Sequence, residues 1–501
     1  MRVVTLFLFT LFSYSMNAQE TYYHEFDLFP IGYNWMNSLH VDEEDIYVGG
    51  DVLCIDGIDT TNCFGVINLT DNLDLKWIKQ FPDFRPARFD AITTVDNHIY
   101  VCGNENTNLH VVKMNLDGNT VSSFSKNMEL LVDNKPLSFY SSRGITIFEE
   151  RILTWGQFDK SDDEEYGYFQ FLDKDFNQDT THYFAYPEAE RLLGNYKLQI
   201  NNSGNIVTSN RIYEPIPPIG ISTILIREFD SDLNIISNSF GPQYGQSNSI
   251  SPYFTIVDDQ HYAFLYRVES IFHESAPLLV YLSQDSNIIW EYDFFKEFGL
   301  DYTDSVVVDI SLSEIITSSD GSIIGGGFIT RYVNNELFYD GFLYKISNQG
   351  KLIWQNQFTK LNDDGSPHSL VIRELSEMQD GRILALGTRR HTSSSFLLMV
   401  DGQTGCVEGY PCDGDILLQT ANSEEDYPLT LYPNPATNAI QIETNHPWSH
   451  YSVSTIMGAT VLSNQWQRNE AISLTSLPNG IYLITFTDNL GNQAVEKFVK
   501  R

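Results

Sequence analysis

The chain has 501 residues, with 66 acidic against 30 basic side chains and a formal net charge of −36. Hydrophobic residues make up 42% and aromatic residues 13%, which is too apolar a composition for a disordered chain. A protein this acidic lacks the basic surface that sequence-independent nucleic-acid binding requires, so we expect no nucleic-acid partner. The length is enough for about three domains.

Residues 1–18 have the features of a secretory signal peptide. Arg2 precedes an apolar run from Val3 to Phe12, and the small residue Ala18 ends the segment. The run is shorter than the roughly 20 residues that a membrane-spanning helix needs. A buried N-terminal strand is the alternative interpretation. No other stretch reaches this length, so we expect no transmembrane segment.

Residues 19–420 contain a repeat of four short strands separated by turns. The second strand of each copy is the clearest element, with intervals of 53, 53, 54, 56, 61 and 60 residues between copies. These strands begin at Ile46, Ile99, Ile152, Ile206, Tyr262, Ile323 and Ile383. Seven such copies predict an all-β, seven-bladed β-propeller, because propellers repeat a four-stranded blade at a similar period. An open sandwich is the alternative, although it does not need equal units.

The two ends of the repeat region predict how the ring closes. Several fourth strands carry a Trp, as in LKWIKQF, IIWEYDF and LIWQNQF, but the seventh copy has no such strand. The segment TYYHEFDLF after the signal peptide matches the missing strand in pattern. We therefore expect Tyr22–Leu28 to pair beside Phe396–Val400, which leaves no open sheet edge at the closure.

The connections between second and third strands are the longest and are expected to lie on one face of the ring. They are Asp51–Cys63, Asp159–Glu165, Tyr213–Gly220, Glu269–Ala276 and Tyr332–Asp340. Because binding residues tend to lie on loops held by a rigid scaffold, we expect any ligand on this long-loop face.

Aromatic and acidic side chains gather on these loops. The candidates for ligand binding are Tyr213, Phe272, His273, Tyr332, Phe338, Tyr339, Asp162, Asp163, Glu164 and Glu165. Aromatic rings can stack on sugars and carboxylates accept hydrogen bonds from hydroxyl groups, while an acidic surface repels anionic polymers. The expected ligand is thus a neutral or cationic glycan, or a surface protein. The alternative is that the aromatics only pack between loops.

The five cysteines lie in a chain expected to be exported, where disulfides can form. We predict the local pairs Cys54–Cys63 and Cys406–Cys412 from the three connectivities that these four residues allow. Cys102 lies among apolar neighbours and is expected to be a buried free thiol.

The sequence gives little sign of a metal or an active site. No Cys or His pair has the spacing of zinc ligands, so no metal is assigned. DKDFNQD at Asp173–Asp179 could hold calcium as the one cofactor, but its position in the repeat favours a turn. Local catalytic motifs are missing from the sequence. We expect a non-enzymatic binding or scaffold module. A polysaccharide-active enzyme is the alternative, because paired carboxylates from different blades leave no local motif.

The end of the chain changes in composition. Residues 427–501 carry four basic and four acidic residues, so the net charge lies before them. Short alternating runs such as AIQIET and IYLITF predict a small Ig-like β-sandwich. The polar residues 421–426 form the linker.

The motifs of this tail point to a known family. LYPNPATNAIQIE, MGATV, LPNGIYLITF and KFVKR occur in order along it. The tail resembles the type A C-terminal sorting domain of the type IX secretion system of Bacteroidota. That resemblance implies recognition by the secretion machinery and location at the cell surface or outside the cell. The matching positions are Pro433, Asn434, Pro435, Gly458, Gly480, Tyr482, Lys497 and Lys500.

Overall fold

The structure is a computed structural model of the full chain, and its described part is almost entirely β-strand, with one short helix, α1 (Phe294–Glu297). The residues that it describes are 23–26, 34–43, 45–56, 59–82, 88–105, 107–128, 130–132, 135–137, 139–161, 164–177, 179–185, 191–192, 197–214, 221–242, 253–270, 273–297, 307–333, 336–361, 367–389, 394–407, 416–418, 429–444, 448–455, 460–466, 471–475, 477–487 and 493–501. The expected signal peptide lies outside this set.

The chain divides into two compact units. One comprises Glu20–Thr420, and the other comprises Ala421–Arg501 together with Met1–Gln19. The first unit contains the repeats and the second contains the motif-bearing tail.

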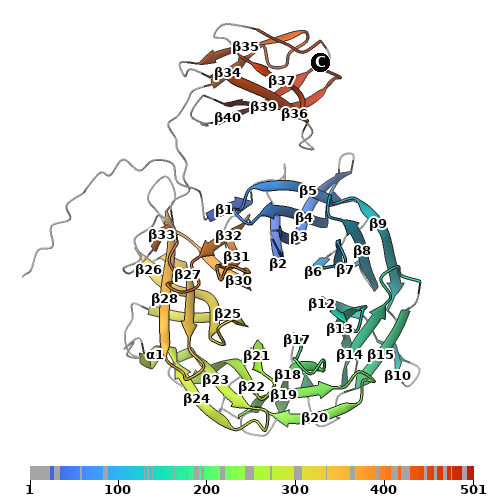
Figure 1. Ribbon diagram of the computed structural model, residues 1–501, viewed down its shortest axis with the longest axis vertical. Helices are drawn as coiled ribbons and strands as arrows, with labels where there is room; N and C mark the ends of the chain where they lie inside the picture. The colour runs from blue at the N-terminus through green and yellow to red at the C-terminus, as the bar shows by residue number, and fades with distance from the viewer. Residues whose placement is uncertain are drawn as a thin grey trace, which may run out of the picture. The chain divides into compact units, whose positions relative to one another are not determined.

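The first unit is a succession of largely antiparallel sheets, most of them made from consecutive strands (Figure 1). In chain order, the first sheet contains β2 (Asn34–Asp42), β3 (Asp45–Asp56), β4 (Asp59–Thr70) and β5 (Leu75–Phe81). The second contains β6 (Arg88–Val95), β7 (His98–Glu105), β8 (Asn108–Asn115) and β9 (Thr120–Asn127). The third contains β12 (Phe139–Phe148), β13 (Arg151–Ser161), β14 (Glu164–Leu172) and β15 (Asp179–Ala185). The next sheet has β17 (Lys197–Ile200), β18 (Ile206–Glu214), β19 (Ile221–Phe229) and β20 (Ile235–Phe240), with β16 (Arg191–Leu192) beside β18; it is followed by β21 (Phe254–Asp258), β22 (His261–Ser270), β23 (His273–Ser283) and β24 (Ile288–Asp293).

Two further sheets complete the series. One contains β25 (Val307–Thr317), β26 (Ile323–Val333), β27 (Glu336–Ile346) and β28 (Leu352–Leu361), extended by β29 (Pro367–His368) and β33 (Ile416–Leu418). The other contains β30 (Leu370–Glu377), β31 (Ile383–Arg389), β32 (Ser394–Val400) and β1 (Tyr23–Phe26). A separate hairpin pairs β10 (Leu130–Val132) with β11 (Lys135–Leu137).

The sheets follow one another around a ring. The first strands β2, β6, β12, β17, β21, β25 and β30 each contact the next, and β30 contacts β2 (Figure 1). The described residues therefore form a propeller-like ring with these strands at its centre.

The N-terminal strand closes the last sheet. β1 pairs antiparallel with β32, in a register that runs from Tyr23 opposite Leu398 to Phe26 opposite Ser395. The predicted pairing is confirmed. Its physical advantage is that a segment from the start of the chain occupies the backbone hydrogen-bonding groups of a sheet formed near the end.

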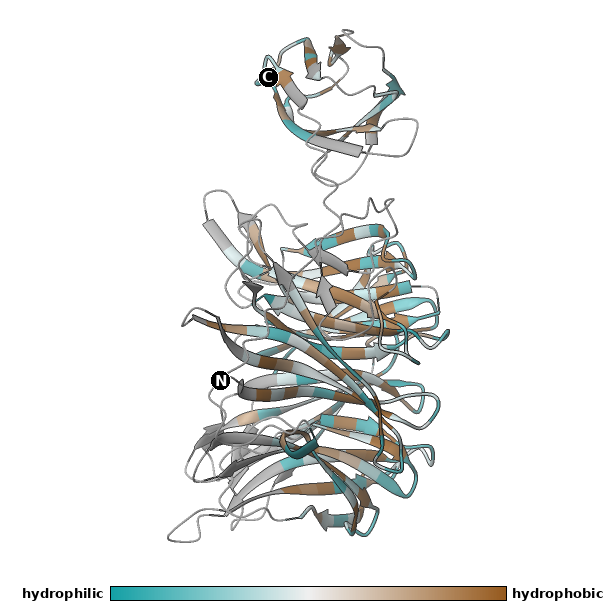
Figure 2. Cartoon of the chain, turned by 90° about the vertical axis from the view of Figure 1, so that its left-hand side faces the viewer, coloured by the Kyte–Doolittle hydropathy of each residue, from teal (hydrophilic) through white to brown (hydrophobic). Residues whose placement is uncertain are grey.

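The connections between second and third strands differ from the expected long loops. The paired strands continue almost to the tip, so that Asp56 lies opposite Asp59, Ser161 opposite Glu164, Ser270 opposite His273 and Val333 opposite Glu336. The prediction of long loops at these four connections was wrong, because backbone pairing continues across the polar residues. On one side of the ring the turns are largely hydrophilic (Figure 2).

Neighbouring sheets pack through aromatic and aliphatic side chains. Phe64 of β4 meets Phe89 of β6 edge to face, with 5.6 Å between the ring centroids. A Cβ atom at Gly49 would lie 2.1 Å from the Phe89 ring. Glycine at this point of the repeat therefore makes room for a ring from the next sheet.

Trp residues on three of the fourth strands link their sheets to the next sheet. The indole nitrogens of Trp77, Trp290 and Trp354 donate to the carbonyl oxygens of Leu116, Asn348 and Gly402 at 2.8, 2.9 and 3.2 Å. Each acceptor lies just after the third strand of the following sheet. The recurring Trp is therefore an inter-sheet contact as well as a strand residue.

Removing one of these links should weaken the ring. Trp354 is buried, so Trp354→Ala is expected to cost about 3–5 kcal/mol of unfolding free energy, through lost packing and a cavity. Trp354→Phe should cost less, because it keeps the ring packing and loses the hydrogen bond. Urea denaturation followed by circular dichroism measures both. The exposed neighbour Ile353 is the control, and equal losses for Ile353→Ala and Trp354→Ala would contradict the assigned contact.

The tail unit is a β-sandwich with its own core. One sheet contains β34 (Leu429–Tyr432), β35 (Ala439–Thr444) and β38 (Ile472–Ser473), and the other contains β37 (Thr460–Gln465), β36 (His450–Thr455), β39 (Gly480–Thr487) and β40 (Gln493–Lys500). Side chains of both sheets form one buried cluster, which includes Ile440, Ile472, Val453, Ile484 and Phe498.

Candidate functional site

The centre of the first unit holds a polar cavity with a volume of about 380 Å³. Every first strand of the ring, or the residue next to it, contributes to its lining. The contributors from the successive sheets include Asn37, Asp90, Arg143, Lys197, Tyr253, Glu314 and Glu374. We call this cavity, with the further lining residues Arg88 and Arg373, the central channel.

β-Bulges help to place side chains in the channel. The pairing registers of β2, β6 and β12 shift at Asn37, Asp90 and Arg143, and that of β30 shifts at Arg373. Each bulge adds one residue to the inner strand, which redirects a side chain without ending the sheet. Polar groups can thus face the channel from strands that otherwise pack against their neighbours.

A network of charged groups joins four sheets across the channel. Oε2 of Glu374 accepts a hydrogen bond from the backbone N–H of Leu39 at 2.8 Å, and Glu314 forms an ion pair with Lys197. Burial raises the pKa of Glu374 to about 8, and the nearby charge of Glu314 raises it further, against opposing contributions from Lys197 and the Leu39 amide. One carboxyl group is therefore largely protonated near neutral pH.

Asp90 is a second buried carboxyl group in the channel with a raised pKa. Its carboxylate accepts a hydrogen bond from Ser142 Oγ and lies 3.4 Å from Nε of Arg88. Burial raises the pKa of Asp90 to about 7, although Ser142 and Arg88 both favour the ionised form. Desolvation has the largest effect on this pKa, because the Asp90 side chain is almost fully buried.

Arg373 differs from the other charged residues of the channel. Its side chain is exposed toward the cavity, and within the residues that the structure describes it forms no hydrogen bond or ion pair. Partial burial of the guanidinium within the cavity lowers its pKa from the ordinary value, while Tyr253 acts in the opposite direction. Its donors are therefore available to a ligand.

A second cavity of about 470 Å³ adjoins the channel and shares Ile145, Trp155 and Leu198 with it. Its lining has amide, hydroxyl and apolar groups and no charged side chain. Of these two cavities, the central channel is therefore the one that contains charged side chains.

Of the ligand candidates expected from the sequence, two lie away from the channel, and the others lie wholly or partly outside the described residues. Tyr339 is buried and packs edge to face on Phe328 with 5.0 Å between centroids, and Phe338 is half-buried. Neither lines the channel. The backbones of Tyr213, His273, Tyr332, Glu164 and Glu165 lie on strands, but their side chains are outside the described set, as are Phe272, Asp162 and Asp163 entirely. Burial gives Tyr339 a packing role.

Sequence reasoning missed the channel residues, although a signal for them exists. Seven of them, one from each repeat, lie nine positions before the residue that marks the recurring second-strand pattern, as with Asn37 before Ile46, and Glu374 before Ile383. All seven residues at this position are polar: Asn37, Asp90, Arg143, Lys197, Tyr253, Glu314 and Glu374. Polar residues at the same position of every repeat indicate that their side chains meet in a water-accessible centre of the ring.

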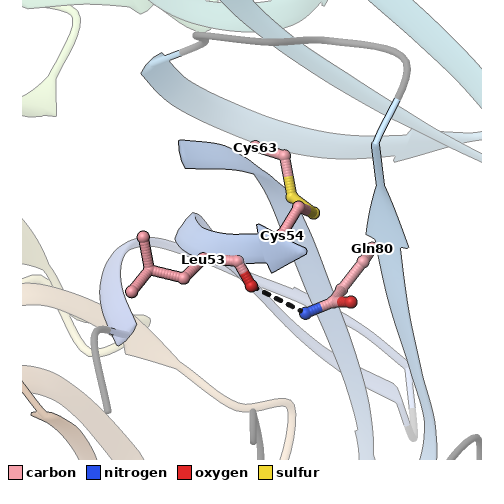
Figure 3. Close-up of a disulfide and its surroundings, with 4 residues drawn as sticks. All are labelled: Leu53, Cys54, Cys63 and Gln80. Atoms are coloured by element: carbon pink, nitrogen blue, oxygen red, sulfur yellow. Dashed lines mark hydrogen bonds between the residues drawn. A yellow bond between two sulfur atoms is a disulfide. The ribbon is translucent and has the colours of Figure 1, made fainter. Parts of the chain in front are cut away.

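The cysteine predictions have separate outcomes. Cys54 of β3 and Cys63 of β4 form a disulfide, as predicted, beside a hydrogen bond of 3.4 Å from Gln80 to Leu53 (Figure 3). Cys102 is a buried free thiol, and burial, with the neighbouring Asp90, raises its pKa well above the usual value. Cys406 is disulfide-bonded, while its predicted partner Cys412 lies outside the described residues.

Asp173–Asp179 contains a turn between β14 and β15. Oδ1 of Asp173 accepts hydrogen bonds from the backbone amides of Asp175 and Asn177 at 3.0 and 2.9 Å. Across the described ranges, no group of three or more His, Cys, Asp or Glu residues could hold a metal ion. Likewise, none of the helices in the described part is long and apolar enough to span a membrane.

Several motif residues hold the tail together. Asn434 donates from Nδ2 to the Lys497 carbonyl at 2.9 Å and accepts at Oδ1 from the Val499 amide at 3.0 Å. The Tyr482 ring stacks on Phe498, with centroids 5.6 Å apart. Pro433 and Pro435 flank Asn434, Gly480 begins β39, Lys497 is exposed and Lys500 is buried, while Gly458 lies outside the described residues.

The ring and its tail define a propeller-like protein with a separate sorting module. Residues 430–501 match the family described as the secretion system C-terminal sorting domain. The chain therefore ends in a sorting domain of the type IX secretion system, which confirms the resemblance drawn from its motifs. This domain directs export to the cell surface or the extracellular space.

Solved structures similar to the chain include a β-propeller domain, an endo-arabinase and Sqt1. The β-propeller domain of the trilobed protease from Pyrococcus furiosus has 11% identity and a TM-score of 0.41, with 73% of this chain and 93% of that chain covered. An endo-arabinase from Bacteroides thetaiotaomicron has 11% identity and a TM-score of 0.32, covering 65% and 94%. Sqt1 from Chaetomium thermophilum has 8% identity and a TM-score of 0.40, covering 77% and 99%. No curated protein sequence matches the chain.

Proposed function

We propose that this protein is an exported binding module whose ligand occupies the central channel. In this proposal residues 19–420 form a seven-bladed propeller closed by its N-terminal strand, residues 421–426 are a linker, and residues 427–501 are an Ig-like sorting domain. The observation that carries the proposal is the convergence of polar side chains from every sheet on one cavity. Converging polar groups in a preformed cavity are typical of small-molecule sites.

The size of the channel favours a small ligand over a surface protein. Its volume of about 380 Å³ is near the lower end of the range of roughly 300–1,000 Å³ found for small-molecule sites. A sugar unit, free or at the end of a glycan, fits this scale and has hydroxyl groups that match Asn37, Tyr253 and the carboxyl groups.

A charge exchange inside the channel tests the proposal. Lys197→Glu combined with Glu314→Lys keeps an ion pair but exchanges its two members. The exchanged protein should stay folded and lose roughly tenfold or more in affinity, about 1.4 kcal/mol, for any sugar or sugar acid that the parent binds. Isothermal titration calorimetry with a panel of monosaccharides, sugar acids and sugar phosphates measures this.

The exposed pair of Lys76 and Asp45, 2.6 Å apart, provides the matched control exchange. Affinity that falls only in the channel exchange supports the proposal. Parent-like affinity in the channel exchange places the ligand elsewhere, and a complete lack of binding by the parent rejects a small-ligand site.

A polysaccharide-active enzyme is the second candidate, and one observation favours it. Glu374, with a pKa of about 8, is largely protonated while the neighbouring Glu314 is paired with Lys197. One protonated and one ionised carboxyl group are the arrangement that glycoside hydrolysis uses. New reducing ends released from an oligosaccharide or polysaccharide incubated with the parent, and absent with Glu314→Gln, would make hydrolysis the function in place of binding.

A further inference from the structure

The central channel reverses the charge balance of the protein. The chain carries a net charge of −36, yet the channel is lined by Arg88, Arg143, Lys197 and Arg373 and by three carboxyl groups. Four of the 30 basic residues are therefore concentrated in a single cavity. The acidic surface led to the expectation of a neutral or cationic ligand, but the basic residues that line the channel favour an anionic ligand.

The carboxyl groups of the channel already have partners within the protein. Glu374 accepts from the Leu39 amide, Glu314 pairs with Lys197, and Asp90 accepts from Ser142. Their capacity to attract a cation is reduced further because burial favours the neutral forms of Asp90 and Glu374. The carboxyl groups therefore compensate only part of the positive charge around them.

Arg373 supplies the contact that a ligand would use. It stands at the bulge of β30, one residue before Glu374, and its guanidinium is exposed to the cavity without a hydrogen bond or ion pair to any described residue. A guanidinium offers a planar fork of N–H donors that matches the oxygens of a carboxylate or phosphate. In a partly dehydrated cavity such a pair is stronger than on the open surface.

We propose that the channel binds a sugar-sized ligand carrying an anionic oxyacid group, and that Arg373 holds this group. This inference rests on the proposed binding function of the channel. Lys197, Arg143 and Arg88 add positive potential around the bound anion, while Asn37 and Tyr253 offer polar partners to the sugar hydroxyls. Arg373 thus determines the charge specificity of the site.

The test compares galactose-based ligands with and without an anionic group. Calorimetric titrations of the full chain use D-galacturonate, its methyl ester, D-galactose and galactose 6-phosphate. The anionic sugars should bind roughly tenfold more tightly than the ester and galactose, a difference of about 1.4 kcal/mol. Preference for galacturonate identifies a carboxylate ligand, and preference for the phosphate identifies a phosphorylated one.

Variants of Arg373 separate the anion contact from binding in general. Arg373→Gln should remove the preference by lowering the affinity for anionic sugars to about that for galactose, while Arg373→Lys should restore part of the preference. Lys351→Gln, on an exposed turn, is the control for lost charge and should retain the full preference. Equal affinity for charged and neutral sugars, unchanged by Arg373→Gln, would overturn this inference and leave the binding function intact. Failure of every sugar to bind would overturn the binding function itself.

Discussion

Deleting residues 427–501 is expected to stop the protein from reaching the cell surface or the medium and to leave it in the periplasm. The sorting domain that directs export occupies residues 430–501, and its two sheets enclose a core of their own. The deletion should therefore remove the export signal without removing any strand of the ring. Immunoblots of periplasm, surface and medium fractions from a host with a type IX secretion system measure the outcome.

Two controls make the deletion specific. Val461→Ala changes an exposed residue of the tail and should leave export unchanged. Residues 427–501 fused to an unrelated periplasmic reporter should carry that reporter out of the cell. Normal export of the shortened protein, at the level of the parent, would contradict the role assigned to the tail.

Glu374→Gln is expected to stabilise the protein at neutral and alkaline pH. Burial raises the pKa of this carboxyl group from 4.5 to about 8, so the folded state holds a proton that the unfolded state releases as the pH rises above 4.5. Folding stability is then lost progressively between about pH 4.5 and pH 8, in proportion to the difference in bound protons. A glutamine keeps an acceptor for the Leu39 amide and does not ionise.

The gain should depend on pH in a defined direction. Because the Glu374 side chain keeps some contact with the channel, we expect a stabilisation on the order of 2 kcal/mol at pH 9 and almost none at pH 4, below the full value of the pKa shift. The charged groups around it are Glu314, Lys197 and Arg373, with Arg88, Arg143, Asp90 and Tyr253 also lining the channel.

Urea denaturation of the full chain at pH 4, 7 and 9 measures this gain. Asp90 also has a raised pKa, but it is present in parent and variant, so it cancels in the comparison to a first approximation. Glu149→Gln, an exposed change on a turn, is the control and should have no effect at any of these pH values. A constant difference between the parent and Glu374→Gln would show that the carboxyl group does not titrate as the burial implies.

Much of the architecture was accessible from the sequence because it depends on local periodicity. The recurring second strands predicted the sheets, and the unmatched segment near Tyr23 predicted its pairing with β32. The spacing of Cys54 and Cys63 predicted their disulfide, since the two lie near the tip of one hairpin. The composition step and motifs of the tail predicted its separate fold and sorting role. Each of these features involves neighbouring residues or one repeated unit.

The candidate site was not accessible in the same way. Tyr339 looked like a surface residue by its position near a connection, but the hairpin continues there and Phe328 covers the ring. Apart from Arg88 with Asp90 and Arg373 with Glu374, the channel residues come from different repeats, and no short motif joins them. Only their common position within the repeat could have indicated that they meet.

The sequence by itself determined the repeating strands, their closure by the N-terminal segment, and the exported character given by the tail. Those properties follow from strand periodicity, turn residues and a contiguous motif, which act over short distances along the chain. Only the tertiary structure decided where the charged groups meet, because ring closure brings Lys197, Glu314 and Glu374 from three sheets into one cavity. It also decided the protonation of Glu374, since the pKa of this carboxyl group depends on burial by residues far away in the sequence.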